Sequence, residues 1–338
     1  MAKSVFSAKT LFFRGDYQNV LALTLDNPRA RWKSEDLGYI IGSLTFVGRC
    51  EEAEILFEKH LLDFTQEQRI EGRVLLGLGF SRRSDYARAR RYFGANRREA
   101  RRRLSQRMRF YVFQGLAFYR YFCGKWKAAL RDSKISFEAA LRADYLLGRA
   151  LSSDLRGHLL VQMGFVQQGL KVLRQAQELA TQTHNQAVNQ AIEISRIAYE
   201  AQFGLDPSGV IERLSAYVES IGAIQDTYSL SQLLLELARQ HLLRGNFLEA
   251  RAVLERAAQQ IYSHQNRRQE VTLQLRYAYL DFLSGESARG LSQLQAAKRA
   301  LDPVVDHELA LSVLGMEHKL LSGLNLATNI EELARKLV

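Results

Sequence analysis

The chain has 338 residues, of which 47% are hydrophobic and only 3 are proline, a composition that excludes collagen-like, low-complexity and wholly disordered chains. Its 47 lysine and arginine residues outnumber its 36 acidic residues, for a formal net charge of +11. Two cysteines, Cys50 and Cys123, are too few for a disulfide framework and favour a reducing, cytoplasmic compartment.

The beginning of the chain does not read as a secretory signal, because Lys9 and Arg14 interrupt its apolar residues. The most apolar stretch, residues 110–124, contains Gln114 and Arg120 and is shorter than the run of about eighteen apolar residues that a membrane span needs. We therefore expect a soluble protein that does not bind membranes.

A turn pattern recurs along the whole chain. Each copy has an amphipathic segment, a glycine or serine at a turn, often an aromatic residue two positions later, and then a small residue after three more. The turn residues are Gly15, Gly48, Ser84, Gly124, Gly164, Gly204, Gly245 and Gly285, with a weaker ninth copy at Gly323. Because the interval stays near forty residues, the pattern predicts one domain of tandem repeats over residues 1–338.

The chemistry of each copy indicates a pair of helices. Glycine tolerates the left-handed backbone that ends a first helix, and the small residue lets two helices approach closely. After Phe247, the apolar residues of one helical stripe are Ala250, Leu254, Ala257 and Ile261. Alternation typical of strands is not sustained anywhere, so we predict an all-α fold.

Residues 233–262, LLLELARQHLLRGNFLEARAVLERAAQQIY, resemble the tetratricopeptide repeat. The residues at its signature spacings are Leu234, Leu237, Ala238, Gly245, Phe247, Ala250, Leu254 and Ala257. The period near forty is more similar to bacterial regulatory variants, such as the arm of MalT-type activators and the Rap-type peptide-responsive regulators. This resemblance implies a right-handed α-solenoid of about eight to nine helix pairs, acting as a non-catalytic scaffold for a protein or peptide in a regulatory assembly.

In that family, partners contact first-helix positions that project away from the core into a concave groove. Carried onto this sequence, those positions are Tyr111, Gln114, Phe118, Tyr121, Asp154, His158, Gln162, Glu236, Arg239, Arg276 and Tyr279. The helix expected around residues 110–122 is aromatic on nearly every side, which is typical of a buried helix. The alternative is that Tyr111, Phe118 and Tyr121 form an aromatic patch that binds a peptide.

Residues 82–109 hold twelve arginines and two acidic residues, so this segment carries +10 of the net charge of +11. We expect a helix from about Asp85 to Leu104, whose buried stripe is Tyr86, Ala89, Phe93, Ala100 and Leu104. One flank of this helix holds Arg88, Arg91, Arg98 and Arg102. The other flank holds Arg83, Arg90, Arg97 and Arg101.

Two interpretations of the arginine segment stay open. The first is a solvated helix face, because arginine is a good helix former. The second is an anion-binding surface, because arginine suits bidentate recognition and the segment has almost no acidic partners at helical spacing. The anion would belong to an acidic protein, to nucleic-acid phosphate, or to an acidic face of this chain or of a second copy.

Motifs of catalysis and of metal or cofactor binding are missing from the sequence. It contains no GxxxxGK[ST], HExxH, CxxC or GxSxG pattern, so we predict no enzyme activity, no metal and no cofactor. A further hypothesis is that the chain is the sensory arm of a transcriptional activator, because it ends within the helix-forming stretch NIEELARKLV.

Overall fold

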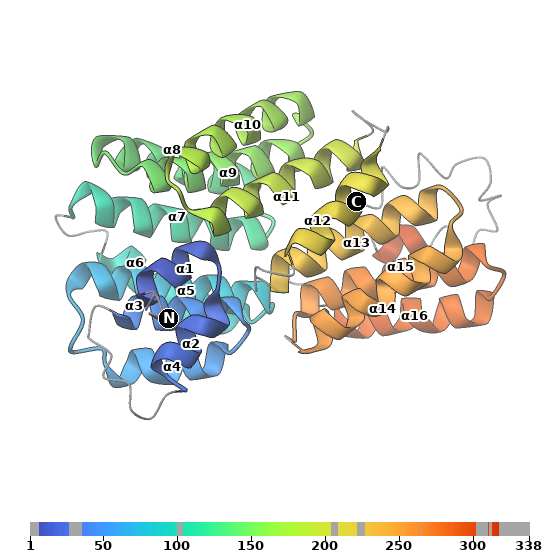
Figure 1. The fold of residues 1–338 in the computed structure, drawn as a ribbon, viewed down its shortest axis with the longest axis horizontal. Coiled ribbons are helices and arrows are strands. Elements are labelled where there is room, and N and C mark those ends of the chain that lie inside the picture. Colours follow the sequence, from blue (N-terminus) through green and yellow to red (C-terminus); the bar gives the residue numbers. More distant parts are fainter. Residues whose placement is uncertain are drawn as a thin grey trace, which may run out of the picture. The chain divides into compact units, whose positions relative to one another are not determined.

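The computed structural model describes residues 7–26, 36–99, 104–203, 209–221, 227–263, 265–301, 310 and 313–317. These residues form sixteen α-helices and contain no β-strand (Figure 1). The first eight are α1 (Ala8–Arg14), α2 (Tyr17–Thr24), α3 (Leu37–Phe46), α4 (Cys50–Lys59), α5 (Gln66–Arg82), α6 (Tyr86–Glu99), α7 (Gln106–Phe122) and α8 (Trp126–Arg142). The others are α9 (Leu146–Gln162), α10 (Val166–Gln182), α11 (Gln186–Gln202), α12 (Val210–Ile221), α13 (Thr227–Leu243), α14 (Phe247–Ser263), α15 (Arg267–Leu283) and α16 (Ser287–Ala300).

Successive helices form pairs, in which an odd-numbered first helix is followed by an even-numbered second helix. Seven of the predicted turn residues are described, and each has a positive φ angle, from 62° at Ser84 to 88° at Gly164. The predicted turns at Gly204 and Gly323 lie outside the described residues. The eight helix pairs follow the predicted periodicity and confirm the all-α repeat fold.

In the N-terminal repeats, the first helix of one repeat contacts the first helix of the next, and second helices contact second helices in the same way. Tyr111 on α7 donates its hydroxyl hydrogen to Glu71 on α5, with 3.0 Å between the oxygens. Arg91 on α6 donates to Glu58 on α4 at 2.8 Å. The repeats therefore stack in two layers, which is how a helical solenoid buries the apolar side of each pair.

The small residues of the repeat permit the close approach of paired helices. A Cβ atom at Gly169 on α10 would lie 2.8 Å from the carbonyl oxygen of Gly157 on α9 and 2.9 Å from the amide nitrogen of Val161. The corresponding alanines of the other repeats, Ala53, Ala89, Ala129 and Ala250, are fully buried. The close approach at Gly169 and the full burial of the four alanines agree with the predicted use of this position.

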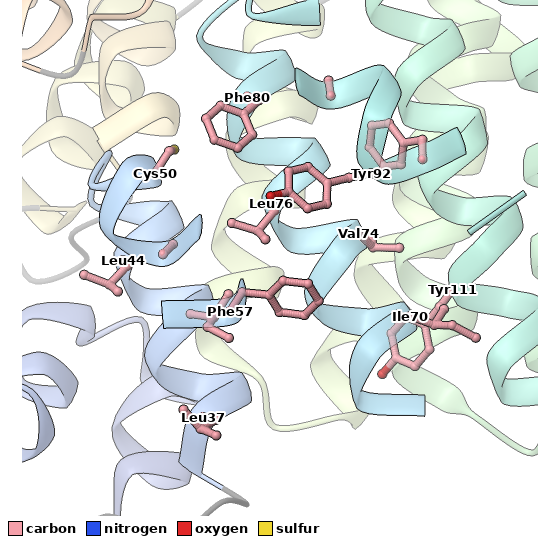
Figure 2. Close-up of a cluster of buried hydrophobic side chains, with 14 of the residues drawn as sticks. Leu37, Leu44, Cys50, Phe57, Ile70, Val74, Leu76, Phe80, Tyr92 and Tyr111 are labelled. Carbon is pink, nitrogen blue, oxygen red and sulfur yellow. The ribbon is translucent and has the colours of Figure 1, made fainter. Parts of the chain in front are cut away.

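A core cluster extends through the N-terminal repeats (Figure 2). Cys50 lies in it as a buried free thiol. On the aromatic helix α7, Phe110, Tyr111 and Phe122 are buried, whereas Phe118 and Tyr121 are half-buried. The core interpretation of this helix therefore holds for its buried aromatic side chains.

The helix expected from Asp85 to Leu104 is described in the structure only in part. Helix α6 is described from Tyr86 to Glu99, and Leu104 is not helical. Ser105 caps the next helix, because its hydroxyl oxygen accepts a hydrogen bond from the amide of Met108 at 3.2 Å. Residues 100–103 lie outside the described residues, so the difference from the prediction is that Leu104 precedes the next helix instead of ending this one.

The chain divides into two compact units. The first comprises Met1–Ser81, Asp85–Arg196 and Gly222–Asp226, and the second comprises Arg82–Ser84, Ile197–Ile221 and Thr227–Val338. The single domain expected over residues 1–338 stays a prediction. Among the described helices of either unit, none has the length and hydropathy needed to cross a bilayer.

Candidate functional site

Predicted groove residues of the first unit lie along the neighbouring helices α7 and α9. The ring of Tyr121 contacts the ring of His158, with centroids 6.2 Å apart. His158 Nε2 in turn lies 3.5 Å from Asp154 Oδ1, one helical turn away. Phe118, Tyr121, Asp154, His158 and Gln162 are all half-buried, so part of each remains accessible. These side chains form a partly exposed strip that offers aromatic surface next to a carboxylate.

Tyr111, also predicted to line the groove, is buried in a polar cluster. Its hydroxyl donates to Glu71 and lies 3.3 Å from the hydroxyl of Tyr145. Burial raises the pKa of Tyr111, and the nearby Glu71 carboxylate adds to the shift. Burial likewise raises the pKa of Glu71, against the hydrogen bond that it accepts. A ligand that reached Tyr111 would have to replace these contacts.

Gln114 is engaged in a buried network that joins three helices. Its side-chain amide donates to the carbonyl of Leu151 on α9 at 3.1 Å. Its oxygen accepts from Ser136 on α8 at 2.9 Å and from Ser152 on α9 at 3.1 Å. Gln114 is only 3% exposed, so its polar atoms stabilise the packing of these helices in the unliganded chain.

In the second unit, four predicted groove residues come together on α13 and α15. Arg239 donates to both oxygens of Glu236, at 2.9 Å from Nε and 2.7 Å from Nη2. Gln240 donates to the same carboxylate at 2.9 Å and to the carbonyl of Ala201 at 3.1 Å. On α15, Arg276 and Tyr279 are buried one helical turn apart. Arg239 and Glu236 are near enough to Arg276 for their charges to shift its pKa.

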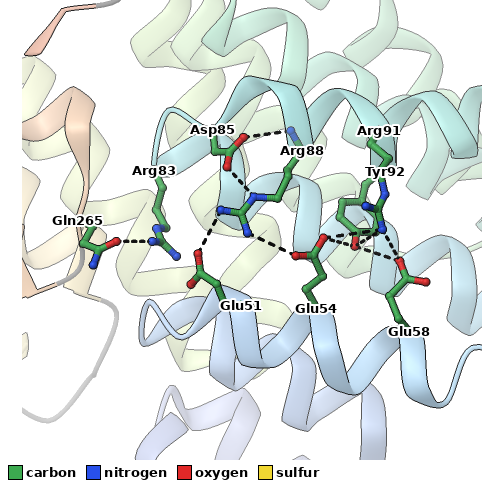
Figure 3. A network of polar contacts seen from close by, with 9 residues as sticks. All are labelled: Glu51, Glu54, Glu58, Arg83, Asp85, Arg88, Arg91, Tyr92 and Gln265. Carbon is green, nitrogen blue, oxygen red and sulfur yellow. Dashed lines mark hydrogen bonds and ion pairs between the residues drawn. The ribbon is translucent and has the colours of Figure 1, made fainter.

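The arginine segment faces a row of acidic residues on α4 (Figure 3). Arg88 donates to Asp85 on its own helix at 2.6 Å, and it reaches Glu51 at 3.2 Å and Glu54 at 3.4 Å. One arginine thus meets three carboxylates. The sequence left open which anion the arginine segment meets. For Arg88, the anion is an acidic face of this same chain.

Arg91 is held by the same row. Its guanidinium lies 2.8 Å from Glu58 and 3.9 Å from Glu54, and it stacks over the ring of Tyr92 (Figure 3). A sign of this pairing is present in the sequence, because the acidic residues precede their arginines by 33 to 37 positions, close to the repeat interval. Partners at helical spacing within the segment do not reveal it, because the acidic residues belong to the preceding repeat.

The other arginines of the segment differ in their surroundings. Arg83, which groups with the second unit, donates to Gln265 at 2.5 Å. Three exposed arginines of α6 make no ion pair with a described residue, and they are Arg90, Arg97 and Arg98. Burial raises the pKa of Asp132 on α8, and the charge of Arg97 partly opposes that rise. Arg101 and Arg102 lie outside the described residues.

Comparison with known proteins defines the class of the fold. No family model matches the chain, and no curated protein matches it. A solved structure does match: the crystal structure of a Rap protein complexed with competence and sporulation factor. The two chains are 12% identical in sequence and superpose with a TM-score of 0.64. The match covers 96% of this chain and 94% of the other. The chain therefore has the tetratricopeptide-type helical repeat fold that its sequence resembles. In the described residues, no three metal-ligating side chains gather as a metal site would require.

Proposed function

We propose that this chain is a non-catalytic repeat scaffold that binds a protein or peptide partner through its first helices, in a bacterial regulatory assembly. The observation that carries the proposal is the juxtaposition of predicted groove residues on neighbouring first helices: Tyr121 with His158 in one unit, and Arg239 with Arg276 in the other. The similar Rap structure holds competence and sporulation factor, which supports a bound partner as the function of this fold.

The strip on α7 and α9 suits an apolar or aromatic side chain of the partner. Phe118 and Tyr121 pack against the small buried cluster that includes Leu155 and Leu159, so their rings are held in place before a ligand arrives. A rigid aromatic surface beside the Asp154–His158 pair loses little conformational entropy on binding. Such anchors supply most of the binding energy of protein interfaces.

In this proposal, the arginines of helix α6 attract an acidic partner electrostatically. Because α4 already neutralises Arg88 and Arg91, the described arginines of α6 whose charge is left for a partner are Arg90, Arg97 and Arg98. Exposed like charges of this kind speed the encounter with an acidic partner more than they strengthen the final complex. The alternative, binding of nucleic-acid phosphate through residues 82–109, would use these arginines as well and is tested alongside.

A random peptide library displayed on phage, selected against the full chain, tests the proposal directly. We expect enriched peptides whose affinity, measured by isothermal titration, falls about tenfold or more with Tyr121→Ala or His158→Ala. The matched control is Phe165→Ala, which removes an exposed aromatic ring at the turn before α10. This control should leave the affinity unchanged.

Two results would overturn the proposal. One is a selection that yields no peptide with measurable affinity. The other is binding that ignores Tyr121→Ala and His158→Ala but is lost when Arg97 and Arg98 are changed to glutamate. If the second result came with a steep salt dependence on DNA or RNA, the nucleic-acid alternative would replace the scaffold proposal.

A further inference from the structure

Arg276 is a buried cation that has no counter-ion among the residues the structure describes. Its side chain is 9% exposed, its Nε atom has no hydrogen-bond partner, and it makes no ion pair with any described residue. Burial lowers the pKa of Arg276 to about 10, and the charge of Arg239 lowers it further. The guanidinium still carries its charge at neutral pH. A buried charge without a counter-ion is strongly destabilising, so this arrangement calls for an explanation.

The nearby acidic group is already occupied. Arg239 is 3% exposed and holds both oxygens of Glu236, while Gln240 donates to one of them as well. Two arginines and one glutamate leave this buried cluster with a net charge of +1. Glu236 therefore balances Arg239 and has little capacity left to balance Arg276.

Tyr279 supplies a second unused donor on the same face of α15. Its ring is buried at 5% exposure, and its hydroxyl has no hydrogen-bond partner among the described residues. Burial raises the pKa of Tyr279, so the hydroxyl keeps its hydrogen at neutral pH. Residues three apart on a helix are neighbours on its surface, which places this hydroxyl beside the Arg276 guanidinium.

We propose that Arg276 and Tyr279 bind a carboxylate of the partner, and that the nearby positive charge of Arg239 assists them. The inference rests on the proposed partner binding and names the chemistry of one subsite. A guanidinium offers two parallel N–H donors that match a carboxylate, and the phenol hydroxyl can donate a third hydrogen bond.

Charge balance favours a carboxylate over a phosphate. One carboxylate carries a single negative charge, which cancels the +1 of the cluster. A phosphate monoester carries a charge of about −1.5 to −2 near neutral pH, so it would leave an excess of negative charge in a buried place. The carboxylate could come from an acidic side chain or from the C-terminus of a peptide, and the experiment separates these sources.

The proposal is tested by following the Nε–Hε NMR signal of Arg276 in the full chain. The signal is identified by its loss in Arg276→Lys, and sodium acetate is added at constant ionic strength against sodium chloride. We expect a shift that saturates with acetate and none with chloride, whereas the signal of the exposed Arg97 should not saturate. Equal responses to acetate and chloride, no response, or saturation by inorganic phosphate but not by acetate would each overturn the proposal.

Two variants give a second readout. Arg276→Lys keeps the charge but loses the paired donors, and it should weaken acetate binding about tenfold. Arg276→Met removes the charge at similar length, and it should abolish the rise in melting temperature with acetate that binding to the folded state causes. The melting temperature of Arg276→Met without acetate should equal or exceed that of the parent chain, because the charge removed had no partner. A large decrease would show that Arg276 stabilises the fold through contacts of its own.

The peptides selected on phage separate this proposal from the proposed function. Each is compared with its C-terminal amide and with versions in which Asp and Glu become Asn and Gln. An affinity loss in one series identifies the source of the carboxylate and supports the subsite. If peptide binding depends on Tyr121 but every uncharged version binds equally well, the proposed carboxylate subsite is wrong and the scaffold proposal still holds. If acetate saturates Arg276 but no peptide binds, the subsite stands and the scaffold proposal fails.

Discussion

Tyr92 on α6 donates its hydroxyl hydrogen to Glu54 on α4, with 2.7 Å between the oxygen atoms. The same carboxylate lies 3.4 Å from Arg88 and 3.9 Å from Arg91, and its side chain is only 18% exposed. Burial raises the pKa of Tyr92, and the Glu54 carboxylate adds to the shift. Glu54, on the second helix of one repeat, therefore neutralises the arginines Arg88 and Arg91 on the second helix of the next repeat.

Removing this carboxylate should destabilise the first unit. We expect Glu54→Ala to lower the free energy of unfolding by about 1–3 kcal/mol, because the buried Tyr92 hydroxyl loses its shorter hydrogen bond and keeps only the one to Glu58 at 3.2 Å, while Arg88 and Arg91 lose a shared carboxylate. Glu54→Gln keeps an acceptor and should lose less. The control is Glu51→Gln, which removes a more exposed charge near Arg88 and should change stability by less than about 1 kcal/mol. Urea denaturation measures all three, and equal effects of Glu54→Ala and Glu51→Gln would contradict the role given to Glu54.

The contact between α9 and α10 gives a prediction about a single methyl group. Gly169→Ala places a Cβ 2.8 Å from the Gly157 carbonyl oxygen, and backbone cannot move aside as a side chain would. We expect a loss of about 1–3 kcal/mol in unfolding free energy. The matched control is Gly94→Ala in α6, where a Cβ would meet nothing within 4 Å, and it should gain about 0.5–1 kcal/mol. Loss of stability in both variants would contradict this account.

Much of the fold could be predicted because each repeat carries its own local signals. The turn residues, the small residue at Ala53 or Ala250, and the apolar stripe after Phe247 each depend on contacts within one helix pair. The start of α7 could not be predicted in the same way, because apolar spacing continues to Leu104. That boundary depends on the capping hydroxyl of Ser105, a single hydrogen bond.

The candidate site was less predictable because its side chains are defined by neighbouring repeats. Gln114 and Arg239 were both predicted to lie on the groove face of their first helices, yet Gln114 is bound by Ser136 and Ser152 while Arg239 forms an ion pair with Glu236. Sequence spacing places both on one face but does not show which neighbours they meet. The same reason hid the pairing of Arg88 with Glu51, which lies 37 residues earlier.

The turn at Ser84 is a place where the sequence departs from its own pattern. Its φ of 62° is the left-handed conformation that the other described repeat turns fill with glycine. Ser84→Gly should raise the unfolding free energy by about 1 kcal/mol, because glycine adopts this conformation without a steric penalty from Cβ. The reverse change at the matching turn, Gly124→Ser, should lower it by a similar amount, since a Cβ there meets nothing within 4 Å and only the backbone is strained. Thermal denaturation of both variants measures this, and shifts in the same direction would contradict it.

His241 on α13 should make the chain less stable in acid. Burial lowers its pKa below 6.5 in the folded state; Glu249 opposes that shift and Arg244 adds to it. The unfolded chain therefore takes up the proton first, so the stability that neutral His241 contributes is complete above pH 6.5 and is lost as the pH falls below it. Urea denaturation at several pH values between 7.5 and 5 should show a smaller decline for His241→Gln, by at most about 1.4 kcal/mol per pH unit. The control is His184→Asn, at an exposed position with a φ of 55° that asparagine tolerates, and it should keep the decline of the parent chain. An identical pH dependence of His241→Gln and the parent chain would assign the acid sensitivity to other groups.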